Sequence, residues 1–159
     1  EEIVEMPVPE ILKATQPLSL QTQLPSTPLP VIDITKPTLI YNGYNLDPLW
    51  RANEDVNRIL LLEPSHFKQY PVSEKVISFI IDLAKNIPGI QVCCCEISEL
   101  TALYNGRNAE QEQAFISKEH PAFMHYPGVK DSRDWMFPEI SGYFTSFSGY
   151  WKKCERYLV

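Results

Sequence analysis

The segment Arg58–Ile97 constrains the fold of this chain more than any other. Two apolar runs, over 58–62 and 90–97, flank a stretch from 73 to 87 in which apolar residues recur at helical spacing. The dipeptide Pro88-Gly89 separates that stretch from the second run. Because two parallel strands need a connection of about a dozen residues, which is usually helical, the pattern predicts a βαβ unit.

The stretch over 73–87 has the features of a complete amphipathic helix. Ser73 is a suitable N-cap, Glu74 lies in the first turn, and Pro88-Gly89 stops the helix. We expect one apolar face of this helix to pack on the sheet. The side chains on that face are Val76, Ile80, Leu83, Ala84 and Ile87.

Further segments extend the same alternation of strand and helix. We expect short strands at 38–42 and 114–118, a short helix at 98–104, a polar loop or helix extension at 108–113, a long loop at 122–141 and a final helix at about 144–158. The alternation predicts an α/β fold: a three-layer sandwich with a mostly parallel sheet of about four to five strands, Rossmann-like in outline.

The first 37 residues differ in composition from the rest. They contain seven of the fourteen prolines and no glycine. Because proline fixes φ and removes an amide donor, we predict an extended arm or interdomain linker over 1–37 and an α/β domain over 38–159. The chain begins Glu-Glu-Ile-Val-Glu without an initiator Met, so we expect it to be a piece of a longer protein.

Charge and cysteine content narrow the class of protein. Fourteen Lys and Arg against twenty Asp and Glu give a net charge of −6, which disfavours binding a nucleic-acid backbone by bulk charge. The cysteines at 93, 94, 95 and 154 match neither a disulfide framework nor a zinc site, and we expect the first three to pack within a strand. A reducing, cytoplasmic compartment is the corresponding expectation. The sequence predicts no membrane span and no signal peptide.

Polar residues at the ends of two predicted strands form one candidate site. In open parallel sheets, ligands bind beyond the carboxyl ends of the strands. Glu63 and His66 follow one strand, whereas Lys118, Glu119 and His120 follow another. Such a set either catalyses proton transfer, binds an anion, or simply closes the strand ends. We expect no metal site, because the histidines lack HxH, HxxxH or HExxH spacing.

A second candidate is the loop over 131–138, which mixes charged and large apolar side chains. Its members of interest are Arg133, Asp134, Trp135 and Phe137. The loop is a docking surface, a lid over a pocket, or a segment in which Trp135 and Phe137 pack into the core while Arg133 pairs with a neighbouring acid. The chain also lacks GxGxxG, GxxxxGK[ST] and GxSxG motifs, which argues against a nucleotide-dependent enzyme of the usual kinds.

Six segments carry a more specific pattern. They are YNGYNLDPLW at 41–50, NRILLLEPSHF at 57–67, YPVSEK at 70–75, KEHP at 118–121, RDWM at 133–136 and WKKCE at 151–155. Taken together, they resemble the C-terminal region of a group of bacterial photolyase/cryptochrome-like flavoproteins. The resemblance covers about residues 24 to 158.

This resemblance implies a domain architecture. In that group, a helical FAD-binding domain precedes an α/β domain similar to the antenna-type domain of photolyases. The present chain resembles the α/β part alone, so FAD and the DNA contacts are expected in the parent protein, and no catalytic residue is assigned here. The resemblance allows for an antenna chromophore in this domain.

The function implied is that of a non-catalytic accessory domain of a DNA-repair lyase or light-sensing flavoprotein. Its partner would be the FAD-binding domain of the parent chain, and the prolines of 1–37 would bridge the two. Two alternatives stay open on the residues alone. One is a small stand-alone hydrolase or transferase with its site at the carboxyl edge of the sheet, and the other is a partner-binding regulatory module that uses the 131–138 loop.

Overall fold

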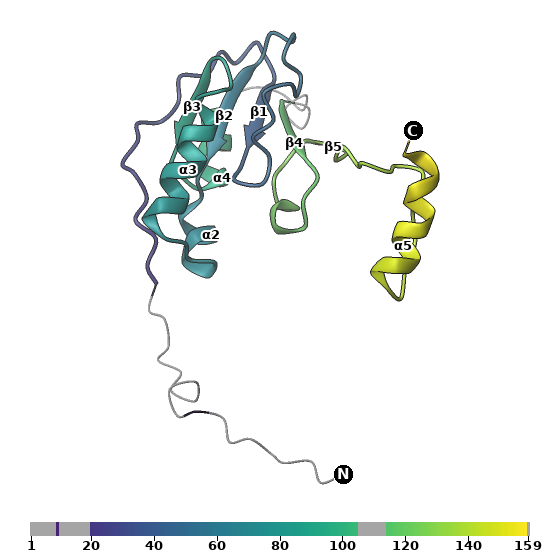
Figure 1. The fold of residues 1–159 in the computed structure, drawn as a ribbon. Coiled ribbons are helices and arrows are strands. Elements are labelled where there is room, and N and C mark those ends of the chain that lie inside the picture. The colour runs from purple at the N-terminus through teal and green to yellow at the C-terminus, as the bar shows by residue number, and fades with distance from the viewer. Residues whose placement is uncertain (1–8, 10–19, 105–113, 159) are drawn as a thin grey trace.

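The chain is built on a five-stranded sheet in which every strand is parallel to its neighbours (Figure 1). The computed structural model describes residue 9 and residues 20–104 and 114–158. The strands are β1 (Thr38–Tyr41), β2 (Asn57–Leu61), β3 (Ile90–Cys93), β4 (Phe115–Lys118) and β5 (Val129–Asp131), in the spatial order β3-β2-β1-β4-β5. The predicted α/β sandwich with a mostly parallel sheet is confirmed.

The predicted βαβ unit is present as β2, α3 (Glu74–Ala84) and β3. Strands β2 and β3 pair in parallel, with Arg58 opposite Ile90 and Leu61 opposite Cys93. Helix α3 begins after Ser73 and carries Glu74 in its first turn, where the positive end of the helix dipole favours an anion.

Helices cover both faces of the sheet, as the alternation of side chains along β1 illustrates. Leu39 and Tyr41 pack with α3 in one apolar cluster, whereas Ile40 packs in a second cluster with Leu100 of α4 (Ile97–Ala102). All three β1 side chains are fully buried. This is the burial expected of a central strand in a parallel sheet, which is shielded on both faces.

Two features between Glu63 and Ile97 correct the expected boundaries. The helix α2 (Pro64–Gln69) was not predicted; it starts with a proline at its first turn, where the missing amide hydrogen costs nothing, and buries Phe67. The third strand ends at Cys93 rather than at 97. The chain turns there into α4, where the Glu99 carboxylate accepts a hydrogen bond from the Glu96 N–H at 2.9 Å.

The predicted loop over 122–141 also contains regular structure. The 3-10 turn η2 (Pro121–Phe123) and the edge strand β5 both lie in or next to it. The final helix is shorter than the expected 144–158: α5 (Phe147–Cys154) starts where the Ser146 hydroxyl accepts from the Gly149 N–H at 3.1 Å, and the 3-10 turn η3 (Glu155–Tyr157) follows. In Figure 1, α5 (yellow) stands apart from the helices on the sheet.

The set of buried side chains on α3 also differs from the expectation. Ile80, Ala84 and Ile87 are buried as predicted, and Ile77 joins them. Val76 and Leu83 were expected in the same buried face, but they remain 40% and 37% exposed. The sheet covers the strip of α3 that carries Ile77, Ile80 and Ala84, whereas Val76 and Leu83 lie together along one border of that strip.

The described part of the proline-rich segment, 20–37, lies along the α/β domain. The Thr22 hydroxyl hydrogen bonds to both the N–H and the carbonyl of Val72, and the Gln91 side chain bonds to the backbone of Val31. The rest of the predicted arm and the polar segment predicted at 108–113 fall outside the described residues. Within those residues, every helix is too short or too polar to cross a lipid bilayer.

Candidate functional site

The order in which the chain adds strands to the sheet reverses beside β1. From β1 the chain adds β2 and β3 on one side, and it later adds β4 and β5 on the other. In open parallel sheets, the carboxyl ends of the strands at such a reversal leave a crevice that binds ligands. The residues that follow β1 and β4, Asn42–Tyr44 and Glu119–His120, lie at this point.

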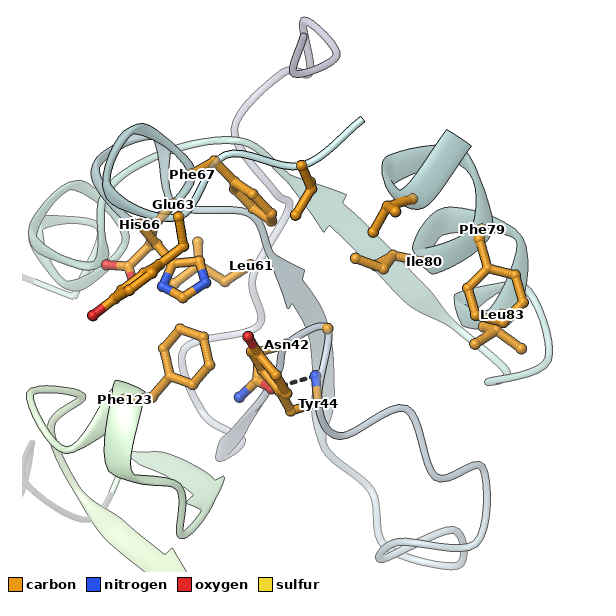
Figure 2. A pocket seen from close by; sticks show the side chains of 14 residues that line it. Asn42, Tyr44, Leu61, Glu63, His66, Phe67, Phe79, Ile80, Leu83 and Phe123 are labelled. Carbon is orange, nitrogen blue, oxygen red and sulfur yellow. Dashed lines mark hydrogen bonds between the residues drawn. The ribbon is translucent and has the colours of Figure 1, made fainter. Parts of the chain in front are cut away.

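A cavity of about 270 Å³ opens at this edge (Figure 2). Its wall is mostly apolar and comes from the ends of β1 and β2, from α2 and α3, and from η2. The apolar lining residues are Leu61, Phe67, Val72, Val76, Phe79, Ile80, Leu83 and Phe123, and the remaining ones are Asn42, Gly43, Tyr44, Glu63, His66 and Tyr70. An apolar wall with a few polar groups is typical of a small-molecule site.

Asn42 is one of the buried polar residues that line this cavity. Its side chain is only 2% exposed, and its Oδ1 accepts a hydrogen bond from the Tyr44 N–H at 2.9 Å. Its Nδ2 has no hydrogen-bond partner among the described residues. Figure 2 shows the Asn42 amide next to Tyr44, in the part of the cavity that Phe123 closes. Because an unsatisfied buried donor costs about 1–3 kcal/mol, a ligand acceptor at Nδ2 would recover that free energy.

Aromatic and imidazole rings surround the same opening. The Tyr44 ring stacks on His120 with centroids 4.4 Å apart and planes at 22°, and His66 lies 4.9 Å from the Phe123 ring and 5.3 Å from that of Tyr70. Burial lowers the pKa of both His66 and His120 below the ordinary value of 6.5. At neutral pH both imidazoles are therefore uncharged and can stack as neutral rings.

Glu63, which follows β2, is buried and engaged. Its Oε1 accepts from the Ile97 N–H at 3.1 Å, and its Oε2 lies 3.1 Å from His125 Nε2. The carboxylate thus ties β2 to the start of α4 and to the segment after η2. Burial beside this carboxylate also raises the pKa of the Tyr126 hydroxyl. A carboxylate that holds an imidazole in this way fixes the orientation of the ring.

Lys118 and Glu119, two of the other predicted edge residues, contact the Arg133–Asp134 segment. Lys118 Nζ lies 2.7 Å from Asp134 Oδ2, and Glu119 Oε1 accepts from the Arg133 N–H at 3.3 Å. These groups border a separate, polar cavity of about 220 Å³. The two cavities share Asn42 and Tyr44, and in the polar one the Asn45 Nδ2 is a second amide without a partner among the described residues.

The structure therefore divides the predicted sheet-edge set in two. Glu63 and His66 border the apolar cavity, whereas Lys118 and Glu119 border the polar one. His120 lines the polar cavity and reaches the apolar one through its stacking on Tyr44.

The loop over 131–138 packs into the core at Phe137 but not at Trp135, contrary to the packing alternative for that residue. Phe137 is buried, with its ring centroid 6.2 Å from that of Trp151, while Trp135 is 58% exposed. The Arg133 guanidinium covers the Trp135 ring at 4.6 Å, and Asp134 pairs with Lys118. Phe137 therefore acts in packing, and Trp135 faces solvent.

Sequence reasoning missed three residues of the site, Asn42, Tyr44 and Phe123, and it considered His125 only as a possible metal ligand. The strand-end rule applied to the first strand would have found Asn42 and Tyr44, since both follow β1 directly. His125 lies in a segment whose composition predicts a loop, and its spacing from other histidines and acidic residues indicates no site.

No group of three or more His, Cys, Asp or Glu side chains suited to a metal ion occurs within 20–104 and 114–158. Comparisons of the sequence with protein-family models and with curated proteins, and of the fold with solved structures, found no match.

Proposed function

We propose that this chain is the non-catalytic α/β accessory domain of a photolyase/cryptochrome-like flavoprotein, and that its sheet-edge cavity binds a planar aromatic chromophore. One observation supports the binding role most directly: an apolar cavity at the strand-order reversal contains one buried amide donor without a partner. The accessory-domain part of the proposal rests on the sequence segments that resemble this group of flavoproteins.

The shape of the site favours a flat ring with a polar end. Tyr44 and Phe123 provide ring faces at the apolar cavity, and stacking on such faces favours an aromatic ligand. Asn42 borders both cavities, so a ligand ring in the apolar one can continue into the polar one. There the Asn45 amide offers a second donor to a ligand oxygen.

The pairing of the charged groups supports binding rather than acid–base catalysis. Lys118 is held by Asp134, and Glu63 is held by His125 and the Ile97 N–H. The lowered pKa of His66 keeps that ring neutral beside the cavity. Such paired groups suit a site that orients a ligand and excludes water.

An exposed apolar strip supports docking on a further domain. Val76, Phe79 and Leu83 lie along α3 at the rim of the cavity, and Phe79 is 62% exposed. In this proposal the FAD-binding domain of the parent chain covers that strip and closes the cavity, and FAD and DNA bind to the parent.

The binding role is tested by titration of the purified chain with two fluorescent rings, riboflavin as a flavin-type probe and folic acid as a pterin-type probe. We expect at least one to bind, measured by fluorescence anisotropy. Asn42→Ala removes the donor and should weaken binding about 5- to 10-fold, which corresponds to one lost hydrogen bond. The matched control Asn53→Ala changes an exposed asparagine. Failure of both probes to bind, or equal affinity of Asn42→Ala and wild type, contradicts the proposal.

A stand-alone hydrolase or transferase is the second candidate, favoured by the pairing of the buried Glu63 carboxylate with the half-exposed His125. A carboxylate that orients an imidazole is a common support for a general base. The isolated chain should then hydrolyse an activated ester such as p-nitrophenyl acetate, and Glu63→Ala and His125→Ala should abolish that turnover. Loss of a genuine turnover activity in these variants would exclude a purely accessory role.

A further inference from the structure

Two of the three consecutive cysteines meet at the end of β3. Cys93 is the last residue of the strand, and the chain bends at Cys95 before α4 begins. Side chains two residues apart in an extended chain point to the same face. The bend brings these two together, so that the sulfurs of Cys93 and Cys95 lie 3.0 Å apart.

The surroundings single out this pair among the four cysteines. Cys93 and Cys95 are both buried in the apolar cluster that also contains Leu100 and Phe123. Cys94 is partly exposed, and its N–H donates to the Thr27 hydroxyl at 2.7 Å. Cys154 lies in α5. A disulfide bond is about 2.05 Å long, so Cys93 and Cys95 need an approach of only about 1 Å.

We propose that Cys93 and Cys95 form a reversible disulfide when a peroxide oxidises the protein. One sulfur attacks an oxygen of hydrogen peroxide, becomes a sulfenic acid, and water leaves. The second sulfur attacks the sulfenic sulfur, the S–S bond forms, and a second water leaves. Two thiols and one peroxide thus yield one disulfide and two waters, and a dithiol such as dithiothreitol reverses the step by exchange.

The same surroundings make the thiol form the resting state. Burial raises the pKa of both the Cys93 and the Cys95 thiols, and the nearby Glu99 carboxylate adds to the effect. Because the thiolate is the reactive species, oxidation of the pair should be slow at neutral pH. The pair therefore responds to sustained peroxide exposure rather than to a brief one.

The position of the pair gives the bond a structural consequence. The next residue, Glu96, accepts hydrogen bonds from the N–H and the hydroxyl of Ser65, at 2.8 and 2.7 Å. Ser65 belongs to α2, whose His66 borders the apolar cavity. The sulfur pair thus lies next to the contact that joins α2 to the start of α4.

The experiment treats the whole chain with hydrogen peroxide and counts free thiols after denaturation, with peptide mapping of the alkylated product by mass spectrometry. The wild type has four cysteines and should lose two thiols, and dithiothreitol should restore them. The variant Cys94→Ser/Cys154→Ser leaves the pair untouched and should still lose two. Cys93→Ser and Cys95→Ser should each form no bridge.

If Cys93→Ser or Cys95→Ser disturbs folding, the double variant Cys94→Ser/Cys154→Ser still tests the inference, because it leaves the buried pair unchanged. An internal bridge mapped to Cys93 and Cys95 in wild type and in the double variant supports the inference. A bridge that includes Cys94, a bridge between two chains, a loss that dithiothreitol does not reverse, or retention of all thiols overturns it.

Discussion

The ion pair between Arg51 and Asp131 should be the strongest polar link between the turn after β1 and the edge strand. Arg51 Nε lies 2.7 Å from Asp131 Oδ2, Arg51 Nη2 lies 3.0 Å from Oδ1, and the Trp50 indole N–H donates to Oδ2 at 2.9 Å. Asp131 is the last residue of β5, a strand of three residues. The Asp131 carboxylate therefore joins the short edge strand β5 to the turn after β1, although β4 lies between β1 and β5 in the sheet.

The magnitude follows from the number and burial of these hydrogen bonds. A hydrogen bond to a charged group contributes about 1.5–3 kcal/mol where it is buried, and solvent screening reduces that value. The Arg51 and Asp131 side chains are 29% and 22% exposed, so a reduced value applies to each bond. We expect Asp131→Ala to lower the free energy of unfolding by about 2–3 kcal/mol and Asp131→Asn, which keeps one acceptor oxygen, by about 1–2 kcal/mol.

Urea unfolding followed by tryptophan fluorescence measures both losses. The matched control is Asp82→Asn, which removes an equally short pair with Lys85 whose side chains are 66% and 71% exposed. We expect the control to change the free energy of unfolding by less than about 0.5 kcal/mol. If Asp131→Asn lowers the free energy of unfolding no more than Asp82→Asn does, the contact between Asp131 and Arg51 does not stabilise β5.

The pH dependence of this pair has a definite sign. Hydrogen bonding to Arg51 holds the pKa of Asp131 below its ordinary value of 3.8. The stabilisation by the ionised carboxylate is therefore fully present above pH 3.8 and is lost as the pH falls through the lower pKa of the folded state. The stability difference between wild type and Asp131→Asn should accordingly stay constant from neutral pH down to about pH 4 and shrink below it.

Three further predictions concern the core and the site. Leu60→Ala empties a fully buried position in β2 and should lower the free energy of unfolding by about 2–5 kcal/mol in urea; a loss below about 1 kcal/mol would mean that the sheet core is not packed as described. Glu63→Leu should cost about 2–4 kcal/mol by thermal or urea unfolding because the Ile97 N–H loses its acceptor, whereas Glu63→Gln, which keeps an acceptor, should cost less; equal losses would argue against this role. Burial lowers the pKa of His66, so the unfolded chain takes up a proton first and stability should fall as the pH drops below 6.5; His66→Phe should flatten that slope, and an unchanged slope would assign it to other groups.

The sequence predicted the sheet well because hydrophobic runs and helical spacing act locally. The runs over 58–62 and 90–97 and the amphipathic stretch between them predicted β2, α3 and β3 in the correct arrangement. The second run nevertheless continues past the strand. Cys94 and Cys95 are about as apolar as Val92 and Cys93, so the local pattern does not show that the strand ends at Cys93, before α4 begins at Ile97.

The edge strand and the site depended on contacts between distant segments. β5 is three residues long, and its pairing with β4 and the contact of Asp131 with Arg51 stabilise it, which no local pattern reveals. The strand-end rule placed Glu63 and His66 at the cavity, because it needs only the strand ends. It could not show that Lys118 and Glu119 turn toward the Arg133–Asp134 segment, since that pairing depends on the position of β5.

The strand order also has a consequence for synthesis of the chain. β1, β2 and β3 are consecutive in sequence and can pair as soon as residue 93 has left the ribosome. The other edge of β1 stays unpaired until β4 has been synthesised, because its partner residues belong to β4; Thr38, for example, pairs with Phe115. Until then β1, the most thoroughly buried strand of the finished domain, presents an unpaired edge to other nascent chains, and such edges promote association between chains. We therefore expect chains truncated between 94 and 114 to aggregate during translation, whereas chains that extend through β4 stay dispersed.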